Sequence, residues 1–339
     1  ISGTVIFMVV FYTLNTFVHF SFLNTAASPA GIAVIHSLFN IGATILLFPF
    51  ANLLEKMAIL AIPDKGSEVE EMEEEKINPD LARLDERFLD KPGFAMEECR
   101  GVAINMARKS KKAMNLAIDL LKEYDEKTSA RVEKLENQID QYEDALGTYL
   151  VKLSERDLSV KDSRILSVLL HCIGDFERIS DHAVNIRDAA VEMNKKNLQF
   201  SDKAKQELLV FSNAIRDIID RAVLAFETGD TGLAKEVEPL EQVVDALNKE
   251  EKQRHINRLR TGTCTIELGF VLSDISTNFE RAADHCSNIA VCLLQVDEGG
   301  FDTHEYLDIL KEENSEEFRH EYMELSEKYT LPESKHGGK

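Results

Sequence analysis

Acidic side chains recur at a four-residue spacing at four places beyond residue 130. Each place has a Glu followed four positions later by an Asp, and the pairs are Glu136/Asp140, Glu177/Asp181, Glu241/Asp245 and Glu280/Asp284. On a helix, residues four apart lie one above the other on the same face. Two carboxylates placed in this way repel each other, and a bound cation would offset that cost. Such oxygen ligands favour hard ions such as Mg²⁺, and also Mn²⁺ and iron.

A single pair would carry no weight, because the chain has 60 acidic residues among 339. Random placement alone gives about ten acidic pairs at this spacing. The repeated context separates these four pairs from that background. Residues 176–186 (FERISDHAVNI) and 279–289 (FERAADHCSNI) are identical at seven of eleven positions, at an offset of 103. Residues 133–140 match residues 238–245 at an offset of 105, and they contain the other two pairs.

The elements that must position these pairs are helices. Apolar residues recur at three- and four-residue spacing from Phe94 to Gln295, and no stretch alternates as a strand would. The pattern predicts helices over residues 94–125, 129–156, 160–196, 202–227, 230–258 and 263–295. We expect Ser201–Asp202 and Thr263 to cap helices and Gly229–Asp230 to separate two of them. Pro239 falls inside the fifth predicted helix, which makes the geometry of the second-repeat site less certain.

A repeat of about a hundred residues with three helices in each copy predicts two three-helix bundles, at residues 94–198 and 199–296. Residues 297–339 are expected to form a last amphipathic helix, at 303–329, and a disordered tail at 334–339. An acidic run that includes Glu68, Glu70 and Glu71 predicts a mobile linker over residues 63–93.

The start of the chain has a different composition. Residues 1–23 and 29–62 are almost wholly apolar, and Glu55 and Lys56 are the only charged side chains before Pro63. Since about 20 apolar residues can cross a bilayer, the pattern predicts two transmembrane helices within residues 1–62. The polar residues His36 and Asn40 would then face protein or a transport path, or join helices through hydrogen bonds. We expect the chain to begin inside a longer protein, since residue 1 is not Met.

Composition also bounds the partners and the compartment. The formal charge of −21 lies beyond residue 62 and no basic cluster is visible, so we expect no nucleic-acid binding. Five scattered cysteines without a CxxC spacing predict reduced, mostly buried thiols on the cytoplasmic side of a membrane.

Two families share these features. Residues 31–40, with His36 and Asn40, resemble the end of the membrane domain of bacterial sodium-dependent phosphate cotransporters, although the Gln-Ser-Ser-Ser phrases of that family are absent. Residues 94–295 resemble the PhoU family of phosphate-uptake regulators, which are pairs of three-helix bundles that bind metal clusters. This second resemblance implies metal sites at Glu136, Asp140, Glu177 and Asp181 and at Glu241, Asp245, Glu280 and Asp284. Weaker candidate ligands are Glu133, Glu238, His182, His285, Asn185 and Asn288.

The two candidate histidines have an equally strong alternative interpretation. Helix geometry turns His182 and His285 about 100° away from the preceding Asp. Each could therefore be a buried, hydrogen-bonded side chain that binds no metal, and the same holds for Asn185 and Asn288.

The resulting prediction is an all-α chain with two transmembrane helices followed by a PhoU-like pair of bundles. The expected function is sodium-coupled import of inorganic phosphate by a plasma-membrane protein, with a metal-binding (Fe, Mn or Mg) regulatory tail in the cytoplasm and a homodimer as a candidate assembly. The alternative is a membrane-anchored PhoU-like sensor or scaffold that regulates phosphate uptake through partner proteins. We predict no enzyme, because a di-iron carboxylate site needs Glu-x-x-His on two helices and the sequence offers it once, at residues 317–320.

Overall fold

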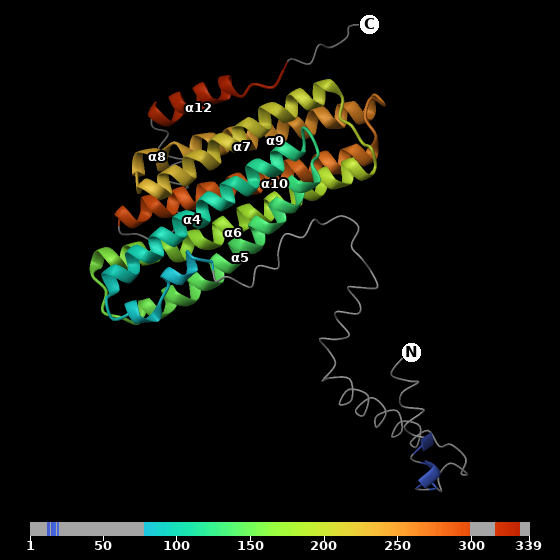
Figure 1. The fold of residues 1–339 in the computed structure, drawn as a ribbon. Coiled ribbons are helices and arrows are strands. Elements are labelled where there is room, and N and C mark those ends of the chain that lie inside the picture. The colour runs from blue at the N-terminus through green and yellow to red at the C-terminus, as the bar shows by residue number, and fades with distance from the viewer. Residues whose placement is uncertain (1–11, 14, 18, 20–77, 299–315, 333–339) are drawn as a thin grey trace. The chain divides into compact units, whose positions relative to one another are not determined.

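The computed structural model describes residues 12–13, 15–17, 19, 78–298 and 316–332 (Figure 1). The chain divides into two compact units, residues 1–74 and 75–339. Of the first unit only the few residues between 12 and 19 are described, and residues 12–13 and 15–17 are helical. The account below concerns the second unit.

The second unit is built from helices throughout its described residues. In chain order they are η3 (Leu81–Arg83), η4 (Glu86–Phe88), α4 (Pro92–Leu120), α5 (Glu126–Ser154), α6 (Val160–Lys195), α7 (Asp202–Thr228), α8 (Thr231–Lys235), α9 (Val237–Arg260), α10 (Ile266–Glu298) and α12 (Glu316–Lys328). Helices α4, α5 and α6 form the first repeat, and α7, α9 and α10 form the second (Figure 1).

Short polar residues begin these helices as their chemistry predicts. Ser159 and Ser201 accept hydrogen bonds from backbone N–H groups in the first turns of α6 and α7, and Asp125 does the same for α5. The predicted cap Thr263 is wrong by two residues, since the Thr265 hydroxyl accepts from the Leu268 N–H at 3.2 Å. Gly229 ends α7 with φ of 69°, a conformation that glycine adopts without steric cost.

The fifth predicted helix, residues 230–258, is two helices. Asp230 caps the five-residue helix α8, and α9 starts afresh at Val237. Pro239 therefore lies in the first turn of α9, where its missing N–H has no helical partner to lose. The break at Glu236 thus removes the distortion that a proline within a helix would cause.

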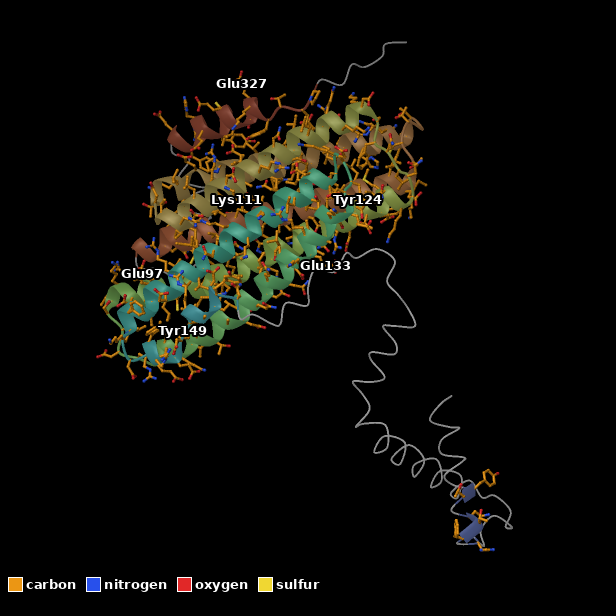
Figure 2. All side chains as sticks on the ribbon, viewed as in Figure 1. Glu97, Lys111, Tyr124, Glu133, Tyr149 and Glu327 are labelled. Carbon is orange, nitrogen blue, oxygen red and sulfur yellow. The ribbon has the colours of Figure 1, made fainter. Side chains whose placement is uncertain are left out.

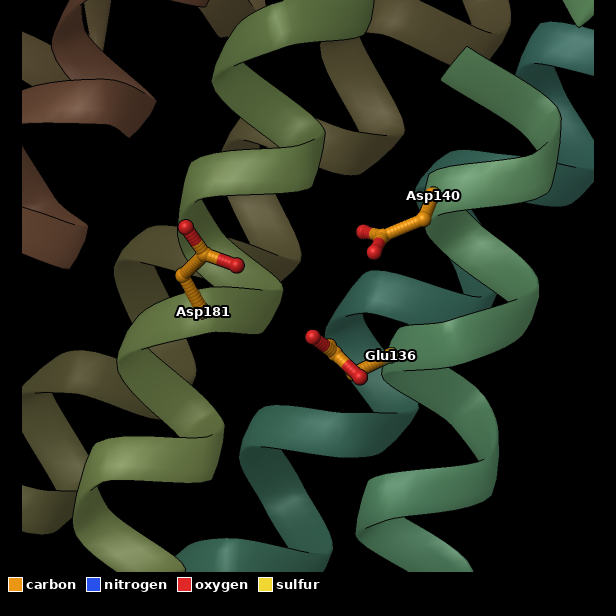
Figure 3. Close-up of side chains that lie close together, drawn as sticks. All are labelled: Glu136, Asp140 and Asp181. Atoms are coloured by element: carbon orange, nitrogen blue, oxygen red, sulfur yellow. The ribbon is translucent and has the colours of Figure 1, made fainter. Parts of the chain in front are cut away.

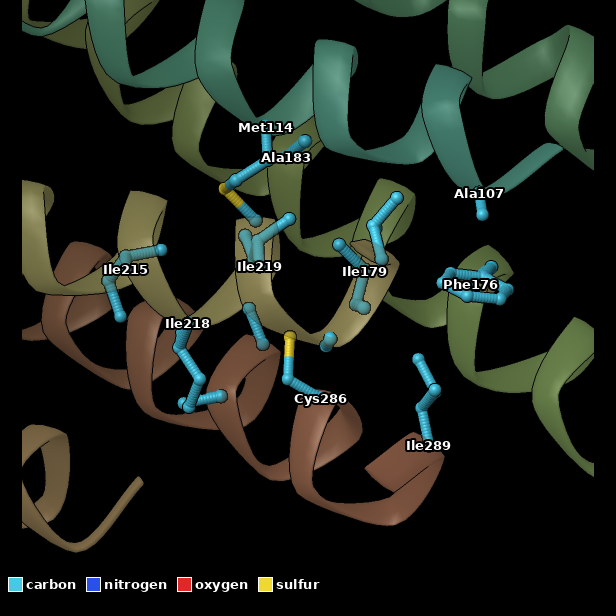
Figure 4. Close-up of a cluster of buried hydrophobic side chains, with 14 of the residues drawn as sticks. Ala107, Met114, Phe176, Ile179, Ala183, Ile215, Ile218, Ile219, Cys286 and Ile289 are labelled. Atoms are coloured by element: carbon cyan, nitrogen blue, oxygen red, sulfur yellow. The ribbon is translucent and has the colours of Figure 1, made fainter. Parts of the chain in front are cut away.

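The core is shared by the two repeats. Helices α4, α6, α7 and α10 pack against one another, and Figure 4 shows Met114, Ile179, Ile219 and Cys286 from these four helices in one buried cluster. Phe176 of α6 meets Phe226 of α7 edge to face, with ring centroids 4.9 Å apart. Because α6 and α10 lie at the centre, α5 and α9 are left on the outside, where their acidic faces reach solvent.

Segments on either side of the repeats pack onto them. The residues before α4 are fixed to α5, where the Tyr149 hydroxyl (labelled in Figure 2) donates to the Asp85 carbonyl oxygen at 2.9 Å. At the other end, α12 lies against α9, and Asp217 of α7 accepts from Lys328 at 2.9 Å and from Tyr329 at 2.7 Å. Each bundle is therefore covered on its outer side by one additional segment.

The fold class predicted from the sequence needs one correction. Among the described residues no helix combines the length and the apolar character that crossing a bilayer requires, so the prediction of two transmembrane helices is wrong for this structure. The long helices α4, α5, α6, α7, α9 and α10 bury their apolar side chains against other helices. An apolar stretch shows that a segment avoids water, but not whether lipid or protein covers it. Residues 20–62 lie outside the described part.

Candidate metal-binding site

Three carboxylates converge between α5 and α6. Glu136 and Asp140 point from one face of α5 towards Asp181 on α6 (Figure 3). One carboxylate oxygen of each residue lies within 4.8 Å of an oxygen of the other two. We call Glu136, Asp140 and Asp181 the first acidic cluster.

Helix packing explains why these side chains face one another. Helices α5 and α6 pack against each other, and the residues that precede Asp140 and Asp181, which are Ile139 and Ser180, are buried. Residues one position away on a helix are turned by about 100°, so Asp140 and Asp181 lie beside these buried positions and not within the core. Glu136 and Asp181 are half-buried, and Asp140 is exposed.

Electrostatics shows that the cluster is costly when it is fully ionised. Partial burial raises the pKa of Glu136 first of all, and the charges of Asp140 and Asp181 add to the effect. The pKa of Asp140 is raised by burial and then by Asp181 and Asp144. A cation placed among these oxygens would reverse both shifts, because an opposite charge favours the ionised form.

Glu177 lies beside the first acidic cluster. Burial, followed by repulsion from Asp181, raises its pKa to about 7. Arg178 lies 3.4 Å from the Glu177 carboxylate and 3.3 Å from that of Asp181, so an exposed guanidinium partly neutralises these two groups. Glu177 is thus a fourth carboxylate beside the group, and its charge is coupled to those of Asp181 and Asp140.

The donor set fits a hard divalent cation. Ligand oxygens around Mg²⁺ lie about 2.9 Å apart when adjacent and about 4.2 Å apart when opposite, and the three carboxylates are separated by at most 4.8 Å. Movement of the side chains towards one another would therefore close the site. Three carboxylates leave coordination positions for water, as Mg²⁺ sites usually do.

The second repeat does not bring its carboxylates together in the same way. Glu241, Asp245, Glu280 and Asp284 form no group of three within metal-binding distance in the described part of the chain. Asp245 is bound by Lys249, one turn further along α9, at 3.1 Å. The pKa of Asp284 is raised to about 6 by burial and by the charges of Glu280 and Asp245.

The two candidate extra ligands differ from each other. Glu133 is exposed and pairs with Arg187 of α6 at 3.2 Å. Its counterpart Glu238 is buried and accepts a hydrogen bond from the Ser287 hydroxyl of α10 at 2.6 Å. Neither carboxylate belongs to the group of three that converges on one point.

The paired histidines lie at the interface between the repeats. The rings of His182 and His285 stack with centroids 5.5 Å apart. Nδ1 of His182 is 2.9 Å from the amide oxygen of Asn278, and Nδ1 of His285 is 2.8 Å from a carboxylate oxygen of Asp175. Asp175 and Asn278 occupy equivalent positions at the offset of 103. Each histidine is therefore hydrogen-bonded to the opposite repeat, a contact that the sequence did not predict.

The asparagines of the phrase have the same role. Asn185 donates to the Asn278 oxygen at 3.0 Å, and Asn288 donates to Asp175 at 3.3 Å. His36 and Asn40 lie outside the described residues.

Sequence reasoning missed the residues that follow each pair on α5 and α9. Glu143 and Asp144 come one turn after Asp140, and their counterparts at the offset of 105 are Asn248 and Lys249. Glu143 raises the pKa of Glu177, and Asp144 raises that of Asp140. The same search for acidic residues at helical spacing, extended by one turn, would have found them.

Comparison with known proteins shows a match to one protein family in both repeats. The model of the PhoU domain family matches residues 103–190 and 208–293, which together make up half of the chain. The two matched segments lie one in each three-helix repeat. The acidic pairs are contained in them.

Individual relatives extend the match. The chain is 23% identical over 188 residues to the phosphate-specific transport system accessory protein PhoU homolog 1 of Thermotoga maritima, covering 55% of this chain and 80% of that protein. It is also 23% identical over 219 residues to a PhoU homolog of Pseudomonas aeruginosa, covering 64% and 90%.

Two crystal structures have the same fold. PhoU from Pseudomonas aeruginosa superposes with a TM-score of 0.57 at 22% identity, covering 60% of this chain and 97% of that one. The phosphate transport system regulatory protein PhoU from Streptococcus pneumoniae gives a TM-score of 0.56 at 17% identity, with coverages of 62% and 99%.

Proposed function

The chain belongs to the PhoU domain family, and we propose that it regulates phosphate transport by binding a partner protein through a metal-loaded acidic surface. The convergence of Glu136, Asp140 and Asp181 carries the proposal, because these side chains gather negative charge that a cation would stabilise. The family match and the names of the relatives, which are phosphate-transport accessory proteins, support the regulatory part.

The residues that would hold the metal are Glu136, Asp140 and Asp181, with Glu177 beside them. The metal would supply positive charge and open coordination positions at the surface of the bundle. An all-oxygen donor set favours Mg²⁺ or Mn²⁺ over metals that select histidine or thiolate. The Nδ1 atoms of His182 and His285 are bonded across the two repeats, which supports assigning the carboxylates as the ligands.

We propose a binding role instead of a catalytic one. The carboxylates lie on an outer helical face, and the two pockets of about 440 and 660 Å³ are lined by other side chains. A partner that offers an acidic or phosphate group could complete the coordination of the metal. Without the metal the same surface would repel such a partner, which makes the interaction depend on occupancy.

Sodium-coupled transport is not part of the proposal, because it depended on the two transmembrane helices corrected above. We place the helical unit in the cytoplasm on the ground of its cysteines. All five are free thiols, and four of them are buried. Thiols in this state suit a reducing compartment.

Phosphate uptake in cells that lack the gene tests the regulatory proposal. We expect the wild-type chain to restore the normal response of uptake to external phosphate. The double variant Asp140→Asn with Asp181→Asn should fail to restore it. A matched change in the second repeat, Asp245→Asn with Asp284→Asn, is the control and should behave more like the wild type. Full restoration by the Asp140/Asp181 variant would contradict the proposal.

A further inference from the structure

A pocket of about 660 Å³ is lined by residues of α4, the start of α6, the end of α7, α8 and α10. The first turns of α6 form one wall of this pocket, and the lining residues of that wall are Val160, Lys161, Arg164, Ile165, Val168 and Leu169. The other lining residues are Arg100 of α4, Phe226 of α7, Gly229, Thr231 of α8 and Leu293 of α10. Leu169 and Asp181 are twelve residues apart on α6, which is about 18 Å along the helix. The pocket is therefore separate from the first acidic cluster.

The charge of the pocket is opposite to that of the chain. Its charged lining residues are Arg100, Lys161 and Arg164, and no acidic side chain lines it. Acidic residues outnumber basic ones by 60 to 39 in the whole sequence, so a lining that is basic throughout runs against the composition.

Two of these cations are not compensated. Arg100 donates to the Glu227 carbonyl oxygen at 3.1 Å, while the Glu227 carboxylate is bound to Arg108 at 2.8 Å. Lys161 and Arg164 lie one turn apart on α6, and neither has an ion-pair partner among the described residues. Two exposed positive charges therefore lie at one wall, and no carboxylate of the described residues forms an ion pair with either of them.

The rest of the lining is apolar. Ile165, Val168, Leu169, Phe226 and Leu293 supply most of it, and Thr231 is the neutral polar side chain among the lining residues. Val160 is 75% exposed although it is aliphatic. A pocket with so few hydrogen-bonding groups cannot form the specific hydrogen bonds that recognition of a sugar or a nucleobase requires. It suits a hydrocarbon body, which would remove this apolar surface from water.

We propose that this pocket binds an anionic amphiphile whose head is a phosphate monoester and whose body is an alkyl chain. A phosphate monoester carries a charge close to −2 at neutral pH, which matches the two uncompensated cations. The planar guanidinium of Arg164 can donate two parallel hydrogen bonds to phosphate oxygens. A carboxylate head would leave one of the two cations unpaired. The pocket is independent of the acidic cluster and of the regulatory proposal.

Isothermal titration of the purified full chain with dodecyl phosphate, kept below its micelle concentration, tests the site. We expect the double variant Lys161→Glu with Arg164→Glu to bind at least tenfold more weakly. The control makes the same charge change at Lys112 and Arg131, two exposed cations of α4 and α5 outside the pocket, and should change the affinity less than twofold. Circular dichroism confirms that both double variants are folded. Equal loss in both would overturn the proposal.

The parts of the ligand are tested separately with dodecanol and with inorganic phosphate. Neither should bind at concentrations at which dodecyl phosphate saturates the protein. Equal binding of dodecanol would show that the cations are not needed, and equal binding of inorganic phosphate would show that the apolar lining is not needed. Either result would overturn the proposal.

A filling variant locates the alkyl chain. Val160→Trp adds bulk at an exposed position without disturbing the core, and we expect it to weaken dodecyl phosphate binding at least fivefold. Unchanged affinity would contradict this site.

Vesicles that contain phosphatidate present a related head group in a bilayer and so distinguish the source of the ligand. If the protein binds dodecyl phosphate monomers or the vesicles, and the Lys161/Arg164 variant does not, the site is supported. The form that binds shows whether the ligand is a free amphiphile or a lipid head group. Binding of neither overturns it.

Discussion

The two repeats carry the same four acidic positions, yet only the first brings three of its carboxylates within metal-binding distance in the described structure. In the first repeat Asp140 faces Asp181, and further acids follow on α5. In the second repeat the equivalent Asp245 is held by Lys249. The shared spacing determines where carboxylates are placed, and the residues one turn away determine whether they need a cation.

The difference can be assigned to two positions. Glu143 and Asp144 in the first repeat correspond to Asn248 and Lys249 in the second. This exchange removes two negative charges and adds one positive charge beside the second group of acids. The Lys249 ammonium supplies Asp245 with a positive charge, as a bound metal would for Asp140. The second group of acids is therefore less dependent on a bound ion.

Removing ligands in each repeat should have the largest and most unequal effect. We expect Asp140→Asn with Asp181→Asn to weaken the tightest Mn²⁺ site by at least about 100-fold, because outer partners of a metal already contribute 10–100-fold. The matched change, Asp245→Asn with Asp284→Asn, should alter that site by less than about threefold. Calorimetric titration with Mn²⁺ and elemental analysis measure both. Equal losses in the two repeats would contradict the comparison.

Exchanging the charges at the decisive position should change Mn²⁺ affinity by about tenfold, equal to about 1.4 kcal/mol. Asp144→Lys should weaken binding in the first repeat, since it supplies an internal cation to Asp140. Lys249→Asp should strengthen binding in the second repeat and raise the number of Mn²⁺ ions bound. Lys112→Asp, the same change on the exposed side of α4, serves as the control. If Lys249→Asp leaves the stoichiometry unchanged, the role given to Lys249 is wrong.

The pH dependence of unfolding should differ between the repeats. The pKa of Glu177 is about 7 in the folded chain against an ordinary value of 4.5, so the folded state binds more protons between these values. Stability in EDTA therefore falls as pH rises from 4.5 to 7. Since the side chain is only 23% exposed, we expect Glu177→Gln to recover about 1 kcal/mol at pH 8 and nothing at pH 4.

Asp284 provides the corresponding test in the second repeat. Its pKa is about 6 against an ordinary value of 3.8, so its effect develops between pH 3.8 and 6. Asp284→Asn should reach its full stabilisation at a lower pH than Glu177→Gln does. Urea unfolding at pH 4, 5, 6, 7 and 8 separates the two windows. Identical pH profiles for the two variants would contradict the assignment.

Much of the helical architecture could be predicted from the sequence. Periodicity placed the long helices, and the two internal matches paired α5 with α9 and α6 with α10. Where the prediction failed, the hydrophobic periodicity of a segment did not determine its structure. The break at Glu236 follows from Asp230 capping a separate short helix, which the apolar pattern alone does not reveal. The transmembrane prediction rested on length and apolar content, and these properties do not specify what covers a segment.

The candidate site could be predicted only in part. The spacing of Glu136 and Asp140 was sufficient to place both on one face, and the match at 177–181 identified the facing helix. Convergence to 4.8 Å depends on how α5 and α6 pack, which no spacing within one helix reports. Whether Asp245 is free to bind a metal depends on Lys249, which forms an ion pair with it. Helical periodicity identifies Lys249 only as an exposed position.

The interface between the repeats offers the smallest predicted effect. His285 is bound by the carboxylate of Asp175, whereas the equivalent His182 is bound by the amide of Asn278. Asp175→Asn would make the two bonds alike, and we expect a loss of about 0.5 kcal/mol, because a bond to a partly exposed carboxylate is only modestly stronger than one to an amide. The reverse change, Asn278→Asp, should raise the pKa of His182, which burial holds below its usual range. NMR titration of the histidine ring protons measures that shift. An unchanged pKa of His182 would show that residue 278 does not bind this histidine.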